Sequence, residues 1–291
     1  MENKDFVLGC DISLWQNDKT TARGIDFEKM KSAGVRFVFV KASQGVYADP
    51  DFRESWDGAA RAGLPRGAYH FLDWRYDVLE QADFFASLLI KNDGELLPVL
   101  DYEMRHYAPK RGRAIQAARL FVERVGKILS RQVMLYTSPG FWQEFGDQDP
   151  YWAGLPLWIA HYSVEKPKVP APWSDWTFWQ YTDRGDGRRF GVESRQIDLD
   201  YFNGNWERFL TFGDIPKRQS QTESQAGSHK MYKALYRLRI RKEPNTQSPT
   251  VGYLEVGETV EALEALSDIM WIRHERGWSL AKYGREYMEA Q

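Results

Sequence analysis

Two carboxylates at the end of one apolar segment are the residues best placed to do chemistry in this chain. Residues 96–103 form an apolar run that predicts a buried strand and ends in Asp101 and Glu103. Side chains two apart on a strand face the same side, so these positions would lie about 7 Å apart along the backbone. Neighbouring acids shift each other's pKa, and one can stay ionised while the other keeps a proton near neutral pH. That combination suits a general acid with an anionic helper.

The same acidic pair has structural interpretations. It could begin a helix, bind a cation or form an ion pair with a nearby base such as Arg105. Perturbed carboxylates also occur in purely structural networks. The elements that position the pair therefore decide between catalysis and structure.

Strand-like and helix-like segments alternate along the first part of the chain. The strand candidates are residues 6–13, 36–41, 67–71, 96–103, 132–136, 157–162, 177–181 and 196–200. Helical patterns cover residues 26–33, 51–62, 76–90 and 111–129, and they become sparse after the fifth strand. This order predicts an α/β fold, an irregular (β/α) barrel of the TIM type with a largely parallel sheet.

Polar or aromatic side chains stand near the ends of these strands, and active sites of such barrels collect at the carboxyl ends of the strands. The residues expected to converge there are Asp11, Lys41, His70, Asp101, Glu103, Tyr136, Tyr162, Gln180 and Asp198. Carboxylates so grouped, with Asp200 close by, suit hydrolysis of a glycosidic bond. Neighbouring aromatic residues would give apolar faces to sugar rings: Trp15, Tyr69, Tyr102, Tyr136, Trp158, Tyr162 and Trp179.

Composition and missing motifs exclude several other classes of protein. The formal net charge is −2, from 39 basic and 41 acidic residues, so no overall field selects nucleic acid or an anionic membrane. No apolar run approaches the roughly 20 residues of a membrane span. Nucleotide-binding glycine loops and the G-x-S-x-G elbow are missing, and the five scattered His residues with the single Cys10 predict no metal, cofactor or disulfide. We expect a monomer folded in a reducing compartment without a secretory signal.

The second part of the chain has a different composition. Residues 213–228 are polar and predict a linker between a domain at 1–212 and another at 229–291. Short strands separated by turns predict a small all-β barrel there. The basic run at 230–242 favours a solvated strand face over a polyanion-binding surface.

Seven ordered motifs in residues 6–212 resemble glycoside hydrolase family 25, the Chalaropsis-type lysozymes found in many phage endolysins. They are Asp11-Ile12-Ser13, Lys41-Ala42-Ser43-Gln44-Gly45, residues 67–71, residues 98–103, residues 157–160, Trp179-Gln180-Tyr181 and residues 197–200. Gln44 departs from the pattern, since the family often has Glu in this turn. That change leaves the substrate contacts of the turn open.

The resemblance implies an N-acetylmuramidase that cleaves peptidoglycan between N-acetylmuramic acid and N-acetylglucosamine, without a cofactor or metal. It implies that Glu103 is the proton donor, that Asp101 supports the charge on the reacting sugar, and that Asp11 and Asp198 line the same pocket. The further substrate-binding candidates are Lys41, Tyr69, His70, Tyr136, Trp158, Tyr162, Gln180 and Asp200. Spacing does not distinguish an enzyme nucleophile from the sugar's own acetamido oxygen.

The C-terminal segment resembles a bacterial SH3 domain in its residues 239–246 and 251–260 and its Gly277-Trp278 pair. Such domains commonly tether lysins to the cell wall, and the candidate contacts are Tyr236, Trp271 and Trp278. The whole chain is then interpreted as a modular phage endolysin, made in the host cytoplasm and reaching bacterial peptidoglycan after release. The alternatives are a peptidoglycan amidase or endopeptidase, for which zinc ligands or a Cys/His pair are missing, and a non-catalytic wall-binding protein on a decayed barrel.

Overall fold

The computed structural model describes residues 6–17, 24–90, 92–212, 231–242, 248–261, 264–266, 270–283, 285–286 and 288–290. The chain folds into two compact units, Met1–Pro216 and Lys217–Gln291. Each unit is described separately below.

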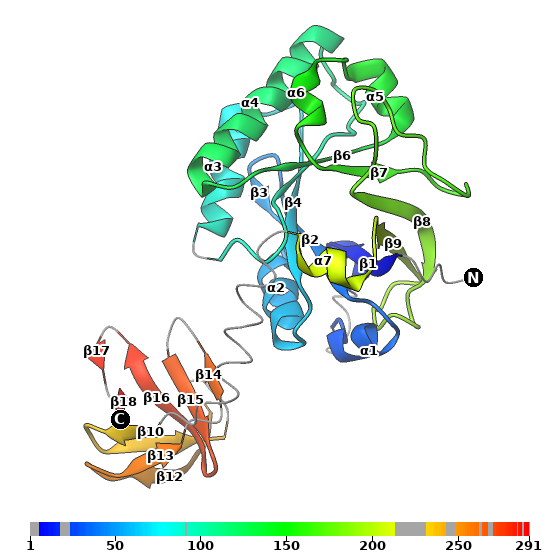
Figure 1. Cartoon of the computed structure of the whole chain (residues 1–291). Coiled ribbons are helices and arrows are strands. Elements are labelled where there is room, and N and C mark those ends of the chain that lie inside the picture. Colours follow the sequence, from blue (N-terminus) through cyan, green and yellow to red (C-terminus); the bar gives the residue numbers. More distant parts are fainter. Residues whose placement is uncertain are drawn as a thin grey trace. The chain divides into compact units, whose positions relative to one another are not determined.

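The first unit is a closed barrel of eight strands, to which a short ninth strand is added (Figure 1). The order is β1-β9-β8-β7-β6-β5-β4-β2, and pairing of β1 with β2 closes the ring. The short strand β3 forms a hairpin with β2. The strands are β1 (Val7–Ile12), β2 (Phe37–Gln44), β3 (Tyr47–Ala48), β4 (Arg66–Phe71), β5 (Val99–Asp101), β6 (Met134–Thr137), β7 (Leu157–Ala160), β8 (Phe178–Asp186) and β9 (Gln196–Phe202). The barrel expected from the sequence is therefore confirmed.

Strand β9 differs from the other barrel strands because it runs antiparallel to both neighbours, β8 and β1. The chain returns from β8 through a short loop, and short connections join antiparallel strands, whereas parallel strands need a long crossover. The expectation that Asp198 stands at a carboxyl end of a parallel strand is wrong. The amino-terminal half of β9 reaches the rim instead, and it carries Asp198 there.

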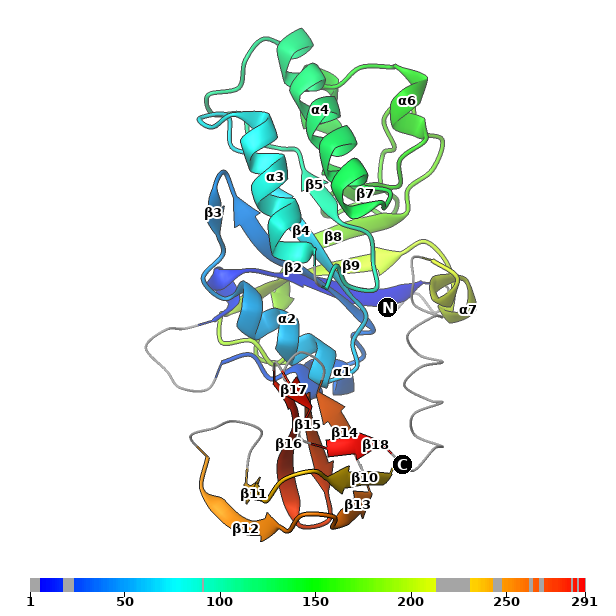
Figure 2. The same cartoon turned by 90° about the vertical axis from the view of Figure 1, so that its left-hand side faces the viewer.

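Helices cover the outside of the barrel (Figures 1 and 2). They are the 3₁₀ helix η1 (Leu14–Gln16), α1 (Phe27–Ser32), α2 (Phe52–Arg61), α3 (Val78–Leu89), α4 (Arg111–Leu129), α5 (Pro139–Phe145), α6 (Pro150–Ala153) and α7 (Trp206–Leu210). Several begin at the expected polar caps: Asp26 accepts a hydrogen bond from the Lys29 amide, and Asp77 accepts from the amides of Leu79 and Glu80. Helices α3 and α4 pack side by side. No described helix has the length and apolar character of a membrane span.

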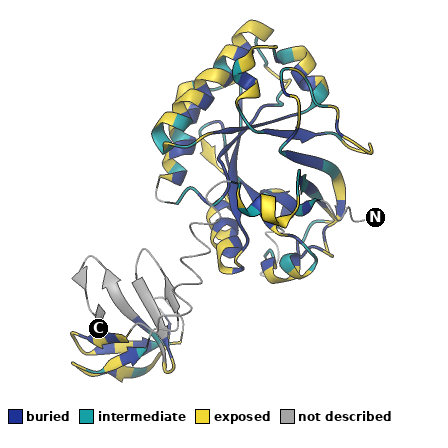
Figure 3. Cartoon of the chain, in the orientation of Figure 1, coloured by how far each residue is buried: buried dark blue, intermediate teal, exposed yellow. Residues whose placement is uncertain are grey.

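Apolar side chains fill both sides of the barrel wall, and the strands are buried along most of their length (Figure 3). Large rings of β2 occupy the interior, where Phe39 stacks on Trp158 with ring centroids 4.4 Å apart. Glycine on β1 makes room for these rings, since a Cβ at Gly9 would lie 2.2 Å from the Phe37 ring. The apolar interior closes the barrel below its carboxyl-end rim, and polar inward-facing side chains begin above it.

The second unit consists of antiparallel strands in two sheets. They are β10 (Met231–Ala234), β11 (Leu238–Arg241), β12 (Thr250–Leu254), β13 (Thr259–Glu261), β14 (Glu264–Leu266), β15 (Met270–His274), β16 (Gly277–Tyr283), β17 (Arg285–Glu286) and β18 (Met288–Ala290). Leu238 and Ile240 face a small core while Arg239 between them is exposed, as the alternating pattern predicts. The end of the basic run thus forms one face of β11.

Candidate active site

Strand pairing brings the predicted acids together on the inner side of one barrel rim. Asp11 on β1 lies opposite Asp198 on β9, and Gln180 on β8 lies opposite Asp200. Residues opposite one another on adjacent strands share a face of the sheet. Asp101 at the end of β5 is aligned with Tyr136 on β6. The rim therefore collects side chains that are far apart in the sequence.

The carboxyl groups of Asp101 and Glu103 form no hydrogen bond or ion pair with the residues that the structure describes. Asp101 is 6% exposed, and its Oδ1 atom accepts no hydrogen bond from any described residue. Glu103 is partly buried just beyond β5, and in the described part of the chain no hydrogen bond or ion pair involves its carboxyl group. Arg105, the neighbouring base, pairs with Glu144 on α5 instead. The interpretation of the acids as a structural ion pair with Arg105 is therefore wrong.

Burial changes the proton affinity of both acids. It raises the pKa of the Asp101 carboxyl well above its ordinary value, and the charge of Glu103 raises it further. Burial, followed by the charge of Asp198, raises the pKa of Glu103. The Lys41 ammonium lowers the pKa of each. The pair consequently keeps a proton at a pH where isolated carboxyl groups have lost theirs.

A chain of hydrogen bonds orients Asp11. The hydroxyl groups of Tyr136 and Tyr162 both donate to Gln180 Oε1, at 2.8 and 2.5 Å. This leaves the Gln180 amide nitrogen to donate to Asp11 Oδ2 at 2.7 Å. The two tyrosines thus fix which end of the amide faces the acid.

Two more acids lie on β9. Burial raises the pKa of Asp198 to about 6, and the charge of Asp183 adds to this shift. Asp200 is fully buried, and its Oδ1 accepts a hydrogen bond from Trp158 Nε1 at 2.8 Å. Its Oδ2 accepts no hydrogen bond from a described residue. Burial raises the pKa of Asp200 well above its ordinary value, and the charge of Asp198 adds to this shift.

The family profile described as glycosyl hydrolases family 25 matches residues 10–188 of this chain. The chain belongs to family 25 of the glycosyl hydrolases. Lysozyme M1 of Streptomyces globisporus is 34% identical over 219 residues, covering 72% of this chain and 71% of that protein. The N,O-diacetylmuramidase of Arthroderma benhamiae is 30% identical over 216 residues, covering 71% of this chain and 86% of that protein.

A solved structure agrees with the family 25 assignment. The bacterial lysozyme from Streptomyces coelicolor superposes with a TM-score of 0.63 at 32% identity, covering 72% of this chain and 97% of that one. The family profile includes Asp11, Asp101 and Glu103 but ends before Asp198 and Asp200. The place of the last two acids at the family 25 rim rests on the register of β9.

Three substrate-binding candidates, His70, Trp158 and Asp200, do not have surfaces that a sugar could reach. The assignment of Asp200 to substrate binding is wrong, because its side chain is fully buried and accepts a hydrogen bond from Trp158. His70 is fully buried on the outer side of the wall, where it bonds to Ser43 and Gln81 and stacks on Phe121 of α4. Burial lowers its pKa to about 3, so it is neutral. The prediction that His70 binds the substrate is therefore wrong. Adjacent side chains on a strand point to opposite faces of the sheet, and on β4 it is Tyr69 that points into the barrel.

Trp158 points inward, but it belongs to the barrel interior rather than to an open surface. Its ring is 2% exposed and packs against Phe39 and Tyr136. We correct its role from a sugar platform to a donor that holds Asp200. Tyr102 and Trp179 are likewise buried in the outer layer, whereas Trp15 on η1 is 74% exposed.

The remaining candidates lie at or beside the rim. Tyr69 and Tyr136 are almost fully buried beneath the acids, and Tyr162 is 38% exposed above them. Lys41 donates to Gln44 Oε1 at 3.0 Å. No group of acidic, His or Cys side chains in the described ranges could hold a metal ion.

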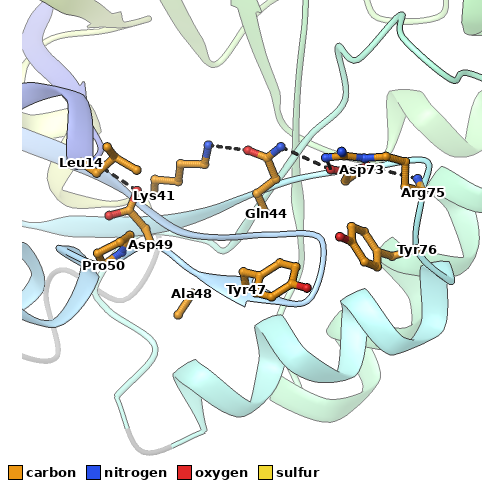
Figure 4. Close-up of a pocket in the computed structure, with 10 residues that line it drawn as sticks. All are labelled: Leu14, Lys41, Gln44, Tyr47, Ala48, Asp49, Pro50, Asp73, Arg75 and Tyr76. Atoms are coloured by element: carbon orange, nitrogen blue, oxygen red, sulfur yellow. Dashed lines mark hydrogen bonds and ion pairs between the residues drawn. The ribbon is translucent and has the colours of Figure 1, made fainter.

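Sequence patterns did not reveal a hollow of about 230 Å³ beside Lys41 (Figure 4). It includes Tyr47, Asp73, Arg75 and Tyr76, which belong to the β2–β3 hairpin and the loop after β4. These residues follow the carboxyl ends of strands, where barrels place their functional residues. This position in the chain is the one feature of the sequence that could have predicted their role.

Proposed function

We propose that this family 25 enzyme is a peptidoglycan muramidase that hydrolyses the β-1,4 bond between N-acetylmuramic acid and N-acetylglucosamine. Relatives named lysozyme and N,O-diacetylmuramidase support this activity. The group of acids at the barrel rim supports it independently, because glycosidases combine a proton donor with an anionic carboxylate. The position of these acids together at one rim also argues against a non-catalytic protein on a decayed barrel.

One observation carries the assignment of roles: Glu103 is the less buried of the two acids, and its carboxyl group forms no hydrogen bond or ion pair with the described residues. Burial raises its pKa, so its carboxyl group can keep a proton that an ordinary glutamate has lost and give it to the glycosidic oxygen as the bond breaks. Asp101 lies deeper, burial raises its pKa as well, and Lys41 favours the charged form of both acids. The proposed roles require that Glu103 holds the proton while Asp101 is ionised. An anionic Asp101 would stabilise the positive charge that develops on the sugar.

The unpaired Oδ1 of Asp101 favours a particular route for the second half of the reaction. A buried acceptor without a donor is costly, and an acetamido N–H of the substrate would satisfy it. Asp101 would then orient the acetamido group so that its own oxygen attacks the sugar carbon. Attack by an enzyme carboxylate is the second route, and inhibition by an acetamido-derived thiazoline sugar distinguishes the first from it.

Product analysis tests the proposed activity. Digestion of purified cell walls should release fragments with new reducing N-acetylmuramic acid ends, and mass spectrometry detects them after borohydride reduction. Free peptides with intact glycan strands would show amide cleavage and contradict the proposal. Glu123→Gln on α4 is the matched control for Glu103→Gln, because Glu123 is an exposed acid paired with Arg119.

We further propose that the second unit is an SH3-like module that holds the enzyme on the cell wall. Its antiparallel strands around a small apolar core support an all-β module. Tyr236 is 47% exposed, and Trp278 is partly buried. The side chain of Trp271 lies outside the described part of the structure.

A further inference from the structure

A hollow lies beside Lys41 at the ends of β2 and β4 (Figure 4). Its walls come from η1, the end of β2, the β2–β3 hairpin and the loop after β4. The polar and aromatic residues of its lining include Lys41, Gln44, Tyr47, Asp73, Arg75 and Tyr76. Lys41 belongs to the hollow and to the acidic rim, since its charge also acts on Asp101 and Glu103.

Acceptors in the hollow already bind protein donors. The Asp73 carboxylate accepts hydrogen bonds from Arg75 Nε at 2.9 Å and from Arg75 Nη2 at 2.6 Å. Gln44 donates to the same carboxylate at 3.3 Å and accepts from Lys41. Asp49 accepts from the backbone amides of Leu14 and Asp51. A ligand would therefore meet few unused acceptors.

Donors in the hollow are still available. Lys41 forms no ion pair with any residue in the described ranges, and one of its three N–H groups is used by Gln44. The Nη1 group of Arg75 donates to none of the residues that the structure describes, and the Arg75 side chain is half exposed. Asp49 and Asp73 also line the hollow, but their oxygens already accept hydrogen bonds from the protein. The donors that are still available, the Lys41 ammonium above all, suit an acceptor group such as a carboxylate.

Aromatic rings form the other wall. Tyr47 and Tyr76 pack edge to face at 5.8 Å, and Tyr47 is 64% exposed. The hairpin is shaped for this contact: Gly45 has a φ of 56°, and a Cβ there would lie 2.6 Å from the Tyr76 ring. An apolar surface beside free cationic donors fits a small organic carboxylate rather than an inorganic anion.

We propose that this hollow binds a carboxylate of the peptide attached to the muramic sugar, an inference that rests on the muramidase function proposed above. Muramic acid carries its peptide on a lactyl group, close to the bond that is cleaved. The peptide supplies carboxylates next to short aliphatic groups, which match the cations and the tyrosine wall. Arg75 is already paired with Asp73, but a sugar ring alone would leave the Lys41 ammonium without an anionic partner and the Nη1 group of Arg75 without an acceptor.

The experiment compares two soluble substrates, glycan chains with their peptides and the same chains after enzymatic removal of the peptides. Arg75→Gln should raise KM for peptide-bearing chains about tenfold and leave kcat unchanged, because it removes one charge-assisted contact. Both constants for stripped chains should stay at the wild-type value. Arg124→Gln on the outer helix α4 is the control, since Arg124 also forms a two-point pair with an aspartate, Asp83, and its side chain is 43% exposed against 50% for Arg75. Asp83 is exposed whereas Asp73 is buried, so the unfolding curve of each variant is recorded beside its kinetics.

Tyr47→Ser provides a second variant. Tyr47 is exposed, whereas Arg75 is paired with the buried Asp73, so replacing Tyr47 disturbs folding less. It should raise KM for peptide-bearing chains about threefold and leave stripped chains unaffected. Equal changes on both substrates, or no change on either, would overturn the peptide assignment. Failure of the wild-type enzyme to cleave either substrate would instead overturn the proposed muramidase function.

Discussion

Glu103 and Asp101 are two positions apart at the end of one strand, and their different surroundings are the basis of the different roles that we propose for them. Asp101 is buried with an unused acceptor, whereas Glu103 is only partly buried and has no described partner. The rim position of both acids could be predicted, because strand ends meet at one edge of a barrel. The hydrogen bonds from Tyr136 to Gln180 and from Gln180 to Asp11 could not be predicted, because only closure of the sheet brings these residues together. The sequence pattern put His70 on the inner face of β4, but the neighbouring residue Tyr69 has that position and His70 points outward.

Charges around Glu103 predict opposite pH shifts in two variants. Asp198→Asn removes a negative charge that raises the pKa of Glu103, so the alkaline limb of kcat/KM should move to lower pH. Lys41→Met removes a positive charge that lowers this pKa, so the limb should move to higher pH. The residual activity of each purified variant across pH measures both shifts. Movement of both limbs in the same direction would contradict the assignment of Glu103 as the acid.

Asp200 predicts a stability change that depends on pH. Burial raises its pKa well above the ordinary value of 3.8, so the folded state holds a proton that the unfolded chain releases as pH rises. This lowers the stability of the wild type as pH increases above 3.8. Asp200→Asn removes the titration and retains an acceptor for Trp158. Urea denaturation measures the free energy of unfolding of the variant minus that of the wild type. This difference should be larger, in favour of the variant, at pH 7 than at pH 4. The same difference at both pH values would contradict this account.

At the scale of elements, hydrophobic periodicity and cap residues were sufficient to predict the eight barrel strands and the main helices. Arg111–Leu129 forms α4 over the range that its amphipathic pattern predicts. The direction of β9 could not be predicted, since residues 196–200 have the same strand pattern in either orientation. That direction matters for the site, because it is what puts Asp198 opposite Asp11.

Glycine on β1 is expected to be essential for packing the barrel interior. Gly9→Ala would place a Cβ 2.2 Å from the Phe37 ring, and overpacking of this kind costs about 1–3 kcal/mol of the free energy of unfolding. Gly112→Ala on α4 is the control, because no atom lies within 4 Å of its added Cβ and alanine favours a helix. Chemical denaturation should show a loss for the first variant and no loss for the second. Equal stability of the two would contradict the packing described here.

At the scale of the whole molecule, the change of composition after residue 212 indicated two parts, and the chain does fold into two compact units. A module that binds the wall raises the local concentration of glycan around the barrel. This advantage applies to insoluble walls and disappears for short soluble chains. Whether the second unit binds the wall, and through which residues, could not be predicted, because the candidate aromatic residues also suit a core.

Tyr236→Ala tests the tethering role in the full chain. It should weaken binding of the inactive Glu103→Gln enzyme to sedimented walls about tenfold, because exposed tyrosines often dominate such contacts. In the active enzyme it should slow wall lysis and leave the cleavage of soluble glycan unchanged. Equal loss on both substrates would indicate a folding defect, and no loss on walls would exclude Tyr236 from the contact.

The most direct measurement for the central claim is kcat/KM of Glu103→Gln on soluble, peptide-free glycan chains, followed by the appearance of reducing ends. Glutamine keeps the size of the side chain and removes its proton, so we expect a loss of about 10²–10⁴-fold with an unchanged unfolding curve. Glu123→Gln should retain the wild-type rate. A folded Glu103→Gln enzyme with near-normal turnover would show that Glu103 is not the proton donor.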